Sequence, residues 1–328
     1  MATIGIPNLS TELEVALSAG MAEVEDLLRS QIEGNYPLVV ETSRHLVTAG
    51  GKRLRPLLTL ITSHFGDPHK RGILEAAVVC ELTHLATLYH DDVMDEAPLR
   101  RGVESANNRW GNTIAILTGD YLFAKASDLL ADLGPEAVRL QARTFERLVI
   151  GQIMETQGPQ KGEDPLAHYL QVVADKTGSL IATSARFGAL LSGANAQTVE
   201  ALTKFGEKIG VAFQVADDLL DVTSDETASG KTPGTDLKEG VPTLVTLYVI
   251  AANNPADKDL IAKLNGPISE SDLSGVITQL RSHKALTDVK DYLAKVAKEA
   301  NDLLVDLPEG SAKEALKSLT FALVNRSS

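Results

Sequence analysis

The chain has 328 residues, of which 44% are hydrophobic, so its apolar content is that of an ordinary globular protein with a sizeable core. Its formal net charge is −13 and it has no basic block or tail, which argues against nucleic acid as the main partner. In so acidic a chain, a phosphate site would have to be a local group of basic residues.

The cysteine content and the hydropathy of the sequence indicate where the protein is located. Cys80 is the single cysteine, which excludes an intrachain disulfide and favours a reducing compartment. The first residues lack a secretory-signal pattern, and no stretch of about 18 apolar residues is present. We therefore expect a cytoplasmic protein without a transmembrane segment.

Helical patterns dominate the first third of the chain. Apolar residues recur at three- and four-residue spacing, Gly50-Gly51 ends the second pattern, and Pro56 suits the first turn of the third. We expect helices over Leu9–Ile32, Tyr36–Ala49, Pro56–Phe65 and residues 72–95.

Helical patterns continue through the rest of the chain, with one long interruption. Further helices are expected over residues 105–132, 135–157, 166–174, 176–192 and Thr198–Val222, and again from Pro242 onward. Residues 223–240 are polar and Gly-rich, and a loop of that length is usually functional, so they are our candidate lid. Since strand patterns and linkers are nearly absent, residues 1–328 are predicted to form a single all-α domain.

An aspartate cluster ends the helix predicted over residues 72–95. Asp91, Asp92 and Asp95 lie in the sequence HDDVMD, and helical spacing puts Asp91 and Asp95 one turn apart on one face. Two such carboxylates repel unless a cation binds between them, and ligands that are all oxygen suit Mg²⁺. The alternative is a solvated polar helix end.

A second cluster repeats this pattern at the end of another apolar helix. Asp217, Asp218 and Asp221 close the sequence FQVADDLLD, with Asp217 and Asp221 again one turn apart. In a helical bundle, two such ends could hold metal ions from opposite walls of a cavity. Carboxylates that bind several Mg²⁺ ions commonly hold a polyphosphate through them.

Basic residues that could bind the phosphates occur in glycine-bearing segments. Glycines let backbone N–H groups approach an anion, and a helix N-terminus adds partial positive charge. For each cation alone, an ordinary surface residue is the alternative. The segments are GGKRLRP with Lys52 and Arg55, Arg100-Arg101-Gly102, Lys176-Thr177-Gly178, and Lys231.

The helix face that leads to Asp91 carries Thr87, His84 and Cys80, so only small or modest side chains lie below the aspartates. This leaves room for a long apolar substrate tail, but close helix packing favours the same residues. His84 is either a core histidine or a phosphate contact.

Together these motifs resemble the trans-isoprenyl diphosphate synthases of the polyprenyl synthetase family. The resemblance covers essentially the whole chain and is densest from Gly50 to Gly240. It implies the isoprenoid synthase fold, a single large helical bundle around a deep central cavity, usually as a homodimer. The implied reaction is head-to-tail condensation of isopentenyl diphosphate with an allylic diphosphate such as farnesyl or geranylgeranyl diphosphate, with release of pyrophosphate.

The resemblance also implies site residues. The metal ligands would be Asp91, Asp95 and Asp217, holding three Mg²⁺ ions (or Mn²⁺), and the catalytic group would add Asp92, Lys176, Asp218 and Asp221. The isopentenyl diphosphate site would comprise Lys52, Arg55, His84 and Arg101. The allylic diphosphate would contact Arg100, Lys176, Thr177, Gln214 and Lys231.

The sequence departs from the family pattern at Val241, where the family often has a lysine. Lys231 or Lys238 would have to supply the diphosphate contact of that lysine.

Product length is predicted from the residues before the first aspartates. Short-chain members place bulky aromatic residues where this chain has Ala86 and Thr87, and Thr83 lies one turn deeper. These small residues favour a trans-polyprenyl product longer than C20. Tyr89 could narrow the tunnel, and geranylgeranyl diphosphate, the C20 product, is the alternative.

Two rival classes remain at this point. A class I terpene cyclase would use one aspartate-rich motif but lacks the GGKRLRP segment. A regulatory subunit of a heteromeric synthase typically loses an aspartate motif, whereas this chain has both.

Overall fold

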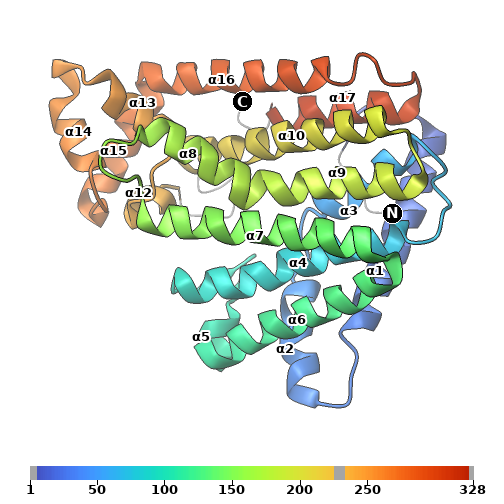
Figure 1. Cartoon of the computed structure of the whole chain (residues 1–328). Helices are drawn as coiled ribbons and strands as arrows, with labels where there is room; N and C mark the ends of the chain where they lie inside the picture. Colours follow the sequence, from blue (N-terminus) through green and yellow to red (C-terminus); the bar gives the residue numbers. More distant parts are fainter. Residues whose placement is uncertain (1–5, 225–232, 325–328) are drawn as a thin grey trace. The chain divides into compact units, whose positions relative to one another are not determined.

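The computed structural model describes residues 6–224 and 233–324. Over these ranges the chain is almost entirely helical, and its only strands form one short antiparallel hairpin (Figure 1). The predicted all-α class is therefore confirmed. None of the described helices is long and apolar enough to cross a membrane.

The chain divides into two compact units, each assembled from separate segments. Unit 1 comprises Met1–Phe145, Leu180–Gly206 and Leu307–Leu316, and unit 2 comprises Glu146–Ser179, Glu207–Asp306 and Lys317–Ser328. The first aspartate motif belongs to unit 1 and the second to unit 2. The single domain over residues 1–328 stays a prediction.

Unit 1 is built around the long helix α4 (Ile73–Met94). Its neighbours are α1 (Thr11–Gln31), α3 (Leu54–Ser63) and α6 (Asn112–Leu133), and Figure 1 shows α4 and α6 side by side. The two helices come very close at Gly119, where an added Cβ would lie 2.6 Å from Cδ2 of His90 and 3.0 Å from the carbonyl oxygen of Ala86. A larger residue at this position would have to displace the His90 ring, so the absence of a side chain allows the close approach of α4 and α6. Unit 1 also contains α2 (Pro37–Thr48), α5 (Ala106–Trp110) and the first part of α7 (Pro135–Gln157).

Unit 2 has its own apolar core. Buried residues of the long helix α10 (Ala196–Thr223) pack with the helices that follow it, and Val215, Leu219 and Val289 are fully buried in this core. A π-helical turn, η1 (Ala174–Gly178), follows α8 (Pro165–Val173). The other elements of unit 2 are α12 (Thr235–Glu239), α13 (Leu244–Ala252), η2 (Pro255–Asp257), α14 (Lys258–Leu264), α15 (Glu270–Ser282) and α16 (Lys284–Asp302). Nearly all of α9 (Ser179–Ser192) belongs to unit 1, and the residues of α10 and α17 (Ser311–Val324) are divided between the two units.

Two expectations need correction. The helix expected over residues 105–132 is divided into α5 and α6 at Gly111, whose φ of 83° and ψ of 159° break the helical path. The segment expected to be a loop over residues 223–240 contains the helix α12. This helix begins directly after Gly234, a residue whose backbone is in a left-handed conformation. The part of that segment over residues 225–232, including Lys231, lies outside the described residues.

Candidate active site

The first aspartate motif occupies the last turn of α4. Asp91 is half-buried within the helix, and Asp95 is exposed at its C-cap, where its backbone N–H donates to the Asp91 carbonyl at 2.8 Å. The predicted spacing of one turn is therefore present, and two carboxylates face the same side of the helix end. Like charges at this spacing destabilise a helix unless a cation binds.

Asp92 differs from its two neighbours because it is fully buried. Its Oδ1 accepts from Nε of Arg100 at 2.5 Å, whereas Oδ2 has no hydrogen-bond partner among the described residues. Burial raises the pKa of this carboxyl group, and the Arg100 guanidinium opposes that rise. Asp92 therefore holds Arg100 against α4.

A short hairpin carries Arg100 and Arg101. Strands β1 (Leu99–Arg100) and β2 (Val103–Glu104) are joined by a two-residue turn, in which Arg101 has φ of 53° and Gly102 has φ of 79°. Positive φ at both central residues is the signature of a type I′ hairpin turn. Although Arg100 and Arg101 are consecutive, their side chains contact different parts of the chain.

Arg101 is held against the segment that precedes α3. Its Nη1 donates to the carbonyl oxygens of Leu46, at 3.1 Å, and of Gly50. The guanidinium lies so close to Gly51 that an added Cβ there would be 2.8 Å from Cζ of Arg101. Gly51 therefore makes room for the Arg101 side chain.

The three cations of GGKRLRP have different surroundings. Lys52 is exposed, whereas Arg53, in a left-handed conformation with φ of 47°, is buried and paired with Glu25 at 2.5 Å and Glu81 at 2.8 Å. Arg53 thus anchors the start of α3 to the rest of unit 1. Its partners lie 28 residues away on either side, so no local sequence signal identified them.

Arg55, His84 and Arg101 form a basic cluster, because the charges of both arginines act on His84. Nε of Arg55 is buried without a hydrogen-bond partner among the described residues, and the carboxylate of the buried Glu81 acts on both arginines. Burial lowers the pKa of His84 well below its usual value, and the charges of Arg55 and Arg101 lower it further. His84 is therefore a neutral imidazole at pH 7, placed among cations. The buried carboxylate of Glu81 was missed from the sequence.

The residues proposed to set product length lie on the buried part of α4. Ala86 and Thr83 are fully buried and Thr87 is 9% exposed. Thr83 Oγ1 accepts from Nε2 of Gln141 on α7 at 2.6 Å. The hydroxyl of Tyr89 donates to the Thr42 carbonyl on α2 at 2.5 Å, which holds this ring on α2.

The second aspartate motif lies near the end of α10. Asp217 and Asp221 are half-buried and Asp218 is 8% exposed. Asp218 accepts from the Tyr169 hydroxyl at 2.5 Å and from Nε2 of Gln214 at 2.8 Å. Burial raises the pKa of Asp218 to about 6, and these two hydrogen bonds oppose the rise. Tyr169, 49 residues earlier in the chain, was not foreseen.

Asp221 belongs to α10, and its carboxylate lies at the N-terminal end of α12. Its Oδ1 and Oδ2 accept from the backbone N–H groups of Thr235 at 3.2 Å and Asp236 at 3.1 Å. Its carboxylate therefore holds the described end of the candidate lid segment against α10.

The π-helical turn η1 carries Lys176 and Thr177. The Lys176 ammonium pairs with Glu155 on α7, and Thr177 Oγ1 donates to Oε1 of Gln214 at 3.0 Å. Because Gln214 in turn donates to Asp218, hydrogen bonds run from η1 to the second aspartate motif. Within unit 2, Lys176, Thr177, Gln214 and Asp218 are thus joined.

The lysine expected to compensate for Val241 has a partner elsewhere in unit 2. Lys238 pairs with Glu270 at 2.5 Å, so this contact would have to break before Lys238 could reach a phosphate.

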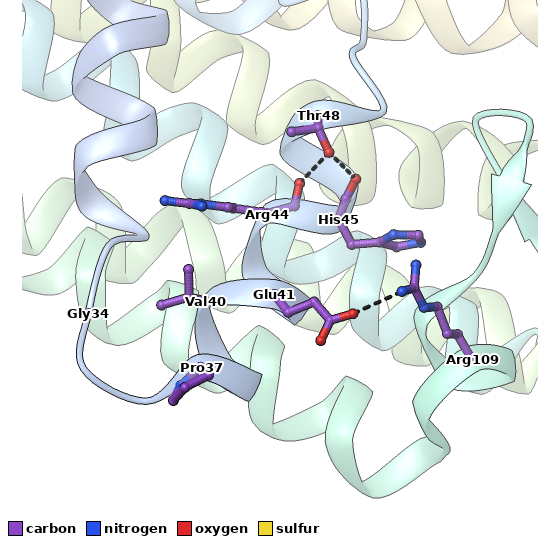
Figure 2. Close-up of a pocket in the computed structure, with 8 residues that line it drawn as sticks. All are labelled: Gly34, Pro37, Val40, Glu41, Arg44, His45, Thr48 and Arg109. Atoms are coloured by element: carbon purple, nitrogen blue, oxygen red, sulfur yellow. Dashed lines mark hydrogen bonds and ion pairs between the residues drawn. The ribbon is translucent and has the colours of Figure 1, made fainter.

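Among the described residues, no three His, Cys, Asp or Glu side chains converge on a closed metal centre. A surface pocket of about 490 Å³ is lined by α2 residues, by Gly34 and by Arg109, which pairs with Glu41 at 2.8 Å (Figure 2). None of the residues that line it is a predicted site residue. We therefore assign the candidate site to the aspartate motifs and the basic residues beside them.

Comparison with known proteins decides the family. The polyprenyl synthetase family model matches residues 36–282, which include both aspartate motifs and every predicted site residue. The chain belongs to the polyprenyl synthetase family.

Relatives in this family include synthases of different product classes. The chain is 45% identical to nonaprenyl diphosphate synthase of Mycobacterium tuberculosis over 95% of this chain and 93% of that protein. It is 35% identical to component 2 of the heptaprenyl diphosphate synthase of Bacillus subtilis over 90% and 85% of the two chains. Among solved structures, geranylgeranyl pyrophosphate synthase of Corynebacterium glutamicum, complexed with calcium and isoprenyl diphosphate, is 41% identical with a TM-score of 0.87, covering 97% of this chain and 98% of that one.

Membership of this family confirms the resemblance drawn from the motifs, and with it the all-α isoprenoid synthase fold and trans-prenyltransferase activity. The roles of individual site residues stay predictions.

Proposed function

We propose that this polyprenyl synthetase condenses isopentenyl diphosphate with an allylic diphosphate and extends it to a trans-polyprenyl diphosphate longer than C20. The observation that supports this most directly is the basic cluster of Arg55, His84 and Arg101 in unit 1, in which His84 lies on the same helix as the first aspartate motif. It would provide an anion site separate from the carboxylates, as a reaction of two diphosphates requires.

The donor set of the two aspartate motifs fits magnesium. Asp91, Asp95 and Asp217 offer carboxylate oxygens, which hard divalent cations prefer, and the relative from Corynebacterium glutamicum is complexed with calcium. We propose that Asp91 and Asp95 in unit 1 and Asp217 in unit 2 would hold the three expected Mg²⁺ ions. Bound there, magnesium would stabilise the negative charge that develops on the departing pyrophosphate.

The chain's own residues would orient the two substrates. Arg55 and Arg101 would bind isopentenyl diphosphate, with the neutral imidazole of His84 donating a hydrogen bond. Lys176 and Thr177 would bind the allylic diphosphate, joined by Arg100, which Asp92 holds in place. Once the allylic C–O bond ionises, the isopentenyl double bond attacks the carbocation and a proton is lost, so no side-chain nucleophile is needed.

Product length beyond C20 is supported by the small residues Ala86 and Thr87 and by the 45% identity to a nonaprenyl diphosphate synthase. The deciding experiment incubates the purified chain with farnesyl and isopentenyl diphosphates and Mg²⁺. We expect products longer than C20 and no turnover with excess EDTA. Accumulation of C20 product alone would refute the length assignment, and turnover without isopentenyl diphosphate would favour a terpene cyclase.

Two variants test the metal ligands. Asp91→Asn and Asp217→Asn should each lower kcat by at least about 100-fold. Asp128→Asn, at an exposed position on α6, is the matched control and should leave kcat unchanged. If all three variants behave alike, the aspartate motifs are not the metal site.

A homodimer is part of the same proposal. Ile116 and Leu117 on α6 are 42% and 56% exposed, and exposed apolar side chains at adjacent helical positions are typical of an interface. Sedimentation of the purified chain, alone and with Ile116→Lys, tests this. Activity of the chain alone also tests whether a partner subunit is required, as the two-component naming of the Bacillus subtilis relative suggests for that protein. The cytoplasmic location stays a prediction.

A further inference from the structure

The π-helical turn η1 is the least regular part of unit 2, and it carries two proposed substrate contacts. A π-helical turn is intrinsically weaker than an α-helical one and is found mostly at functional sites. Something must therefore hold Lys176 and Thr177 in this geometry.

One face of α7 lies against the turn through three successive helical turns. Arg147, Gly151 and Glu155 are spaced by four residues and so share a face. Nε of Arg147 donates to Oδ1 of Asp175 at 2.8 Å, and Glu155 pairs with the Lys176 ammonium. Between them, a Cβ at Gly151 would lie 2.6 Å from the backbone nitrogen of Lys176, so the backbones are in close contact.

Arg147 also ties the turn to α10. Its Nη2 donates to Oε1 of Glu207 at 2.7 Å while its Nε holds Asp175. The other oxygen of the buried Asp175 accepts from Nε2 of Gln171 at 2.6 Å, so both carboxylate oxygens are used. Because a guanidinium presents several N–H groups in a rigid plane, one arginine can fix two carboxylates on different helices.

We propose that Arg147 is a positioning residue of the prenyltransferase reaction: by clamping Asp175 to Glu207 it holds η1 in the geometry that presents Lys176 and Thr177 to the allylic diphosphate. The inference rests on the proposed role of these two residues. It assigns to Arg147 no contact with substrate.

Steady-state kinetics of Arg147→Met test the proposal. We expect the KM for the allylic diphosphate to rise about tenfold, the size of effect expected from losing a charge-assisted hydrogen bond, while the KM for isopentenyl diphosphate changes less than about twofold. Lys208→Met is the matched control, because it removes another ion pair of α10, with Glu299 at 2.5 Å, and the two side chains are similarly exposed, at 45% and 41%. The control should change neither KM.

A double-mutant cycle separates positioning from a general loss of structure. If Arg147 acts through Lys176 and Thr177, adding Arg147→Met to the double variant Lys176→Met/Thr177→Val should change the allylic KM by less than about threefold. An effect of Arg147→Met in that background as large as in the unchanged chain would overturn the proposal. So would equal rises in both substrates' KM values.

The outcomes distinguish this inference from the proposed function. If Lys176→Met leaves the allylic KM unchanged, the assigned role of Lys176 is wrong. If Lys176→Met raises it and Arg147→Met does not, the positioning role is wrong while the site assignment stands. Should Arg147→Met fail to fold, Arg147→Lys carries the same comparison, because lysine keeps the charge but lacks the rigid planar guanidinium whose Nε and Nη2 hold Asp175 and Glu207 from separate positions.

Discussion

Replacing Gly51 by alanine should weaken the isopentenyl diphosphate site selectively. The added Cβ would lie 2.8 Å from Cζ and 2.9 Å from Nη1 of Arg101, closer than real Cβ atoms come to other heavy atoms. Arg101 would have to move and would lose its hydrogen bonds to the carbonyl oxygens of Leu46 and Gly50. Because the displaced Arg101 would no longer lie beside Arg55 and His84, the affinity for isopentenyl diphosphate should fall.

The magnitude follows from the contact that a displaced Arg101 could no longer make to the diphosphate. A hydrogen bond to a charged group contributes about 1.5 kcal/mol or more, so its loss corresponds to at least about a tenfold rise in the KM for isopentenyl diphosphate. Alanine at φ of 146° also adds backbone strain of about 1 kcal/mol, which lowers stability rather than affinity.

Gly50→Ala is the matched control. Gly50 has φ of 85°, so alanine is strained there too, but an added Cβ would meet no atom within 4 Å. Both variants should lose similar stability in thermal denaturation, and only Gly51→Ala should raise the KM for isopentenyl diphosphate. Equal kinetic effects in the two variants, or an equal rise in the allylic KM, would refute this account of the glycine pair.

Three further predictions concern unit 1. Burial raises the pKa of the Cys80 thiol to about 12, so it should not react with a thiol reagent at pH 8 until the chain unfolds. The thiol in the unfolded chain ionises near pH 8.5, so Cys80 should make the free energy of unfolding fall as pH rises above that value. When this free energy is measured by denaturant titration at several pH values, Cys80→Ala should show a smaller decrease with pH. Arg100→Met should lower the free energy of unfolding by about 3 kcal/mol because it leaves the buried Asp92 unpaired, and adding Asp92→Asn should recover part of the loss; no recovery would show that the pair is not coupled. Ala86→Phe should shorten the products in the farnesyl diphosphate assay, and unchanged lengths in a folded variant would show that Ala86 does not line the tunnel.

The sequence was most informative where a signal is local. The aspartate motifs lie at the ends of α4 and α10, as helical spacing predicts, and most helices were identified by apolar periodicity. Gly111 was missed as a break because a single glycine often continues a helix, whereas here its ψ of 159° does not. The hairpin at Leu99–Glu104 was missed because two-residue strands are too short to show alternation.

Partners distant in the chain could not be predicted. Arg53 and Arg55 look equivalent in GGKRLRP, but Arg53 is paired with Glu25 and Glu81 and Arg55 is not the partner of either by hydrogen bond. Likewise, no sequence signal near Asp218 predicts that the Tyr169 hydroxyl donates a hydrogen bond to it. Such pairings depend on how helices far apart in sequence meet, which composition and spacing do not encode.

The hairpin of β1 and β2 bears on how the two substrates would influence each other. Arg100 is held by Asp92 and Arg101 by the carbonyl groups before α3, and one peptide bond joins the two residues. If these arginines bind different diphosphates, as proposed, a shift of one guanidinium towards its diphosphate would also act on the contacts of the other. The two binding events would then be coupled, and the coupling would be reciprocal: whatever factor the first substrate imposed on the affinity for the second would be imposed in return.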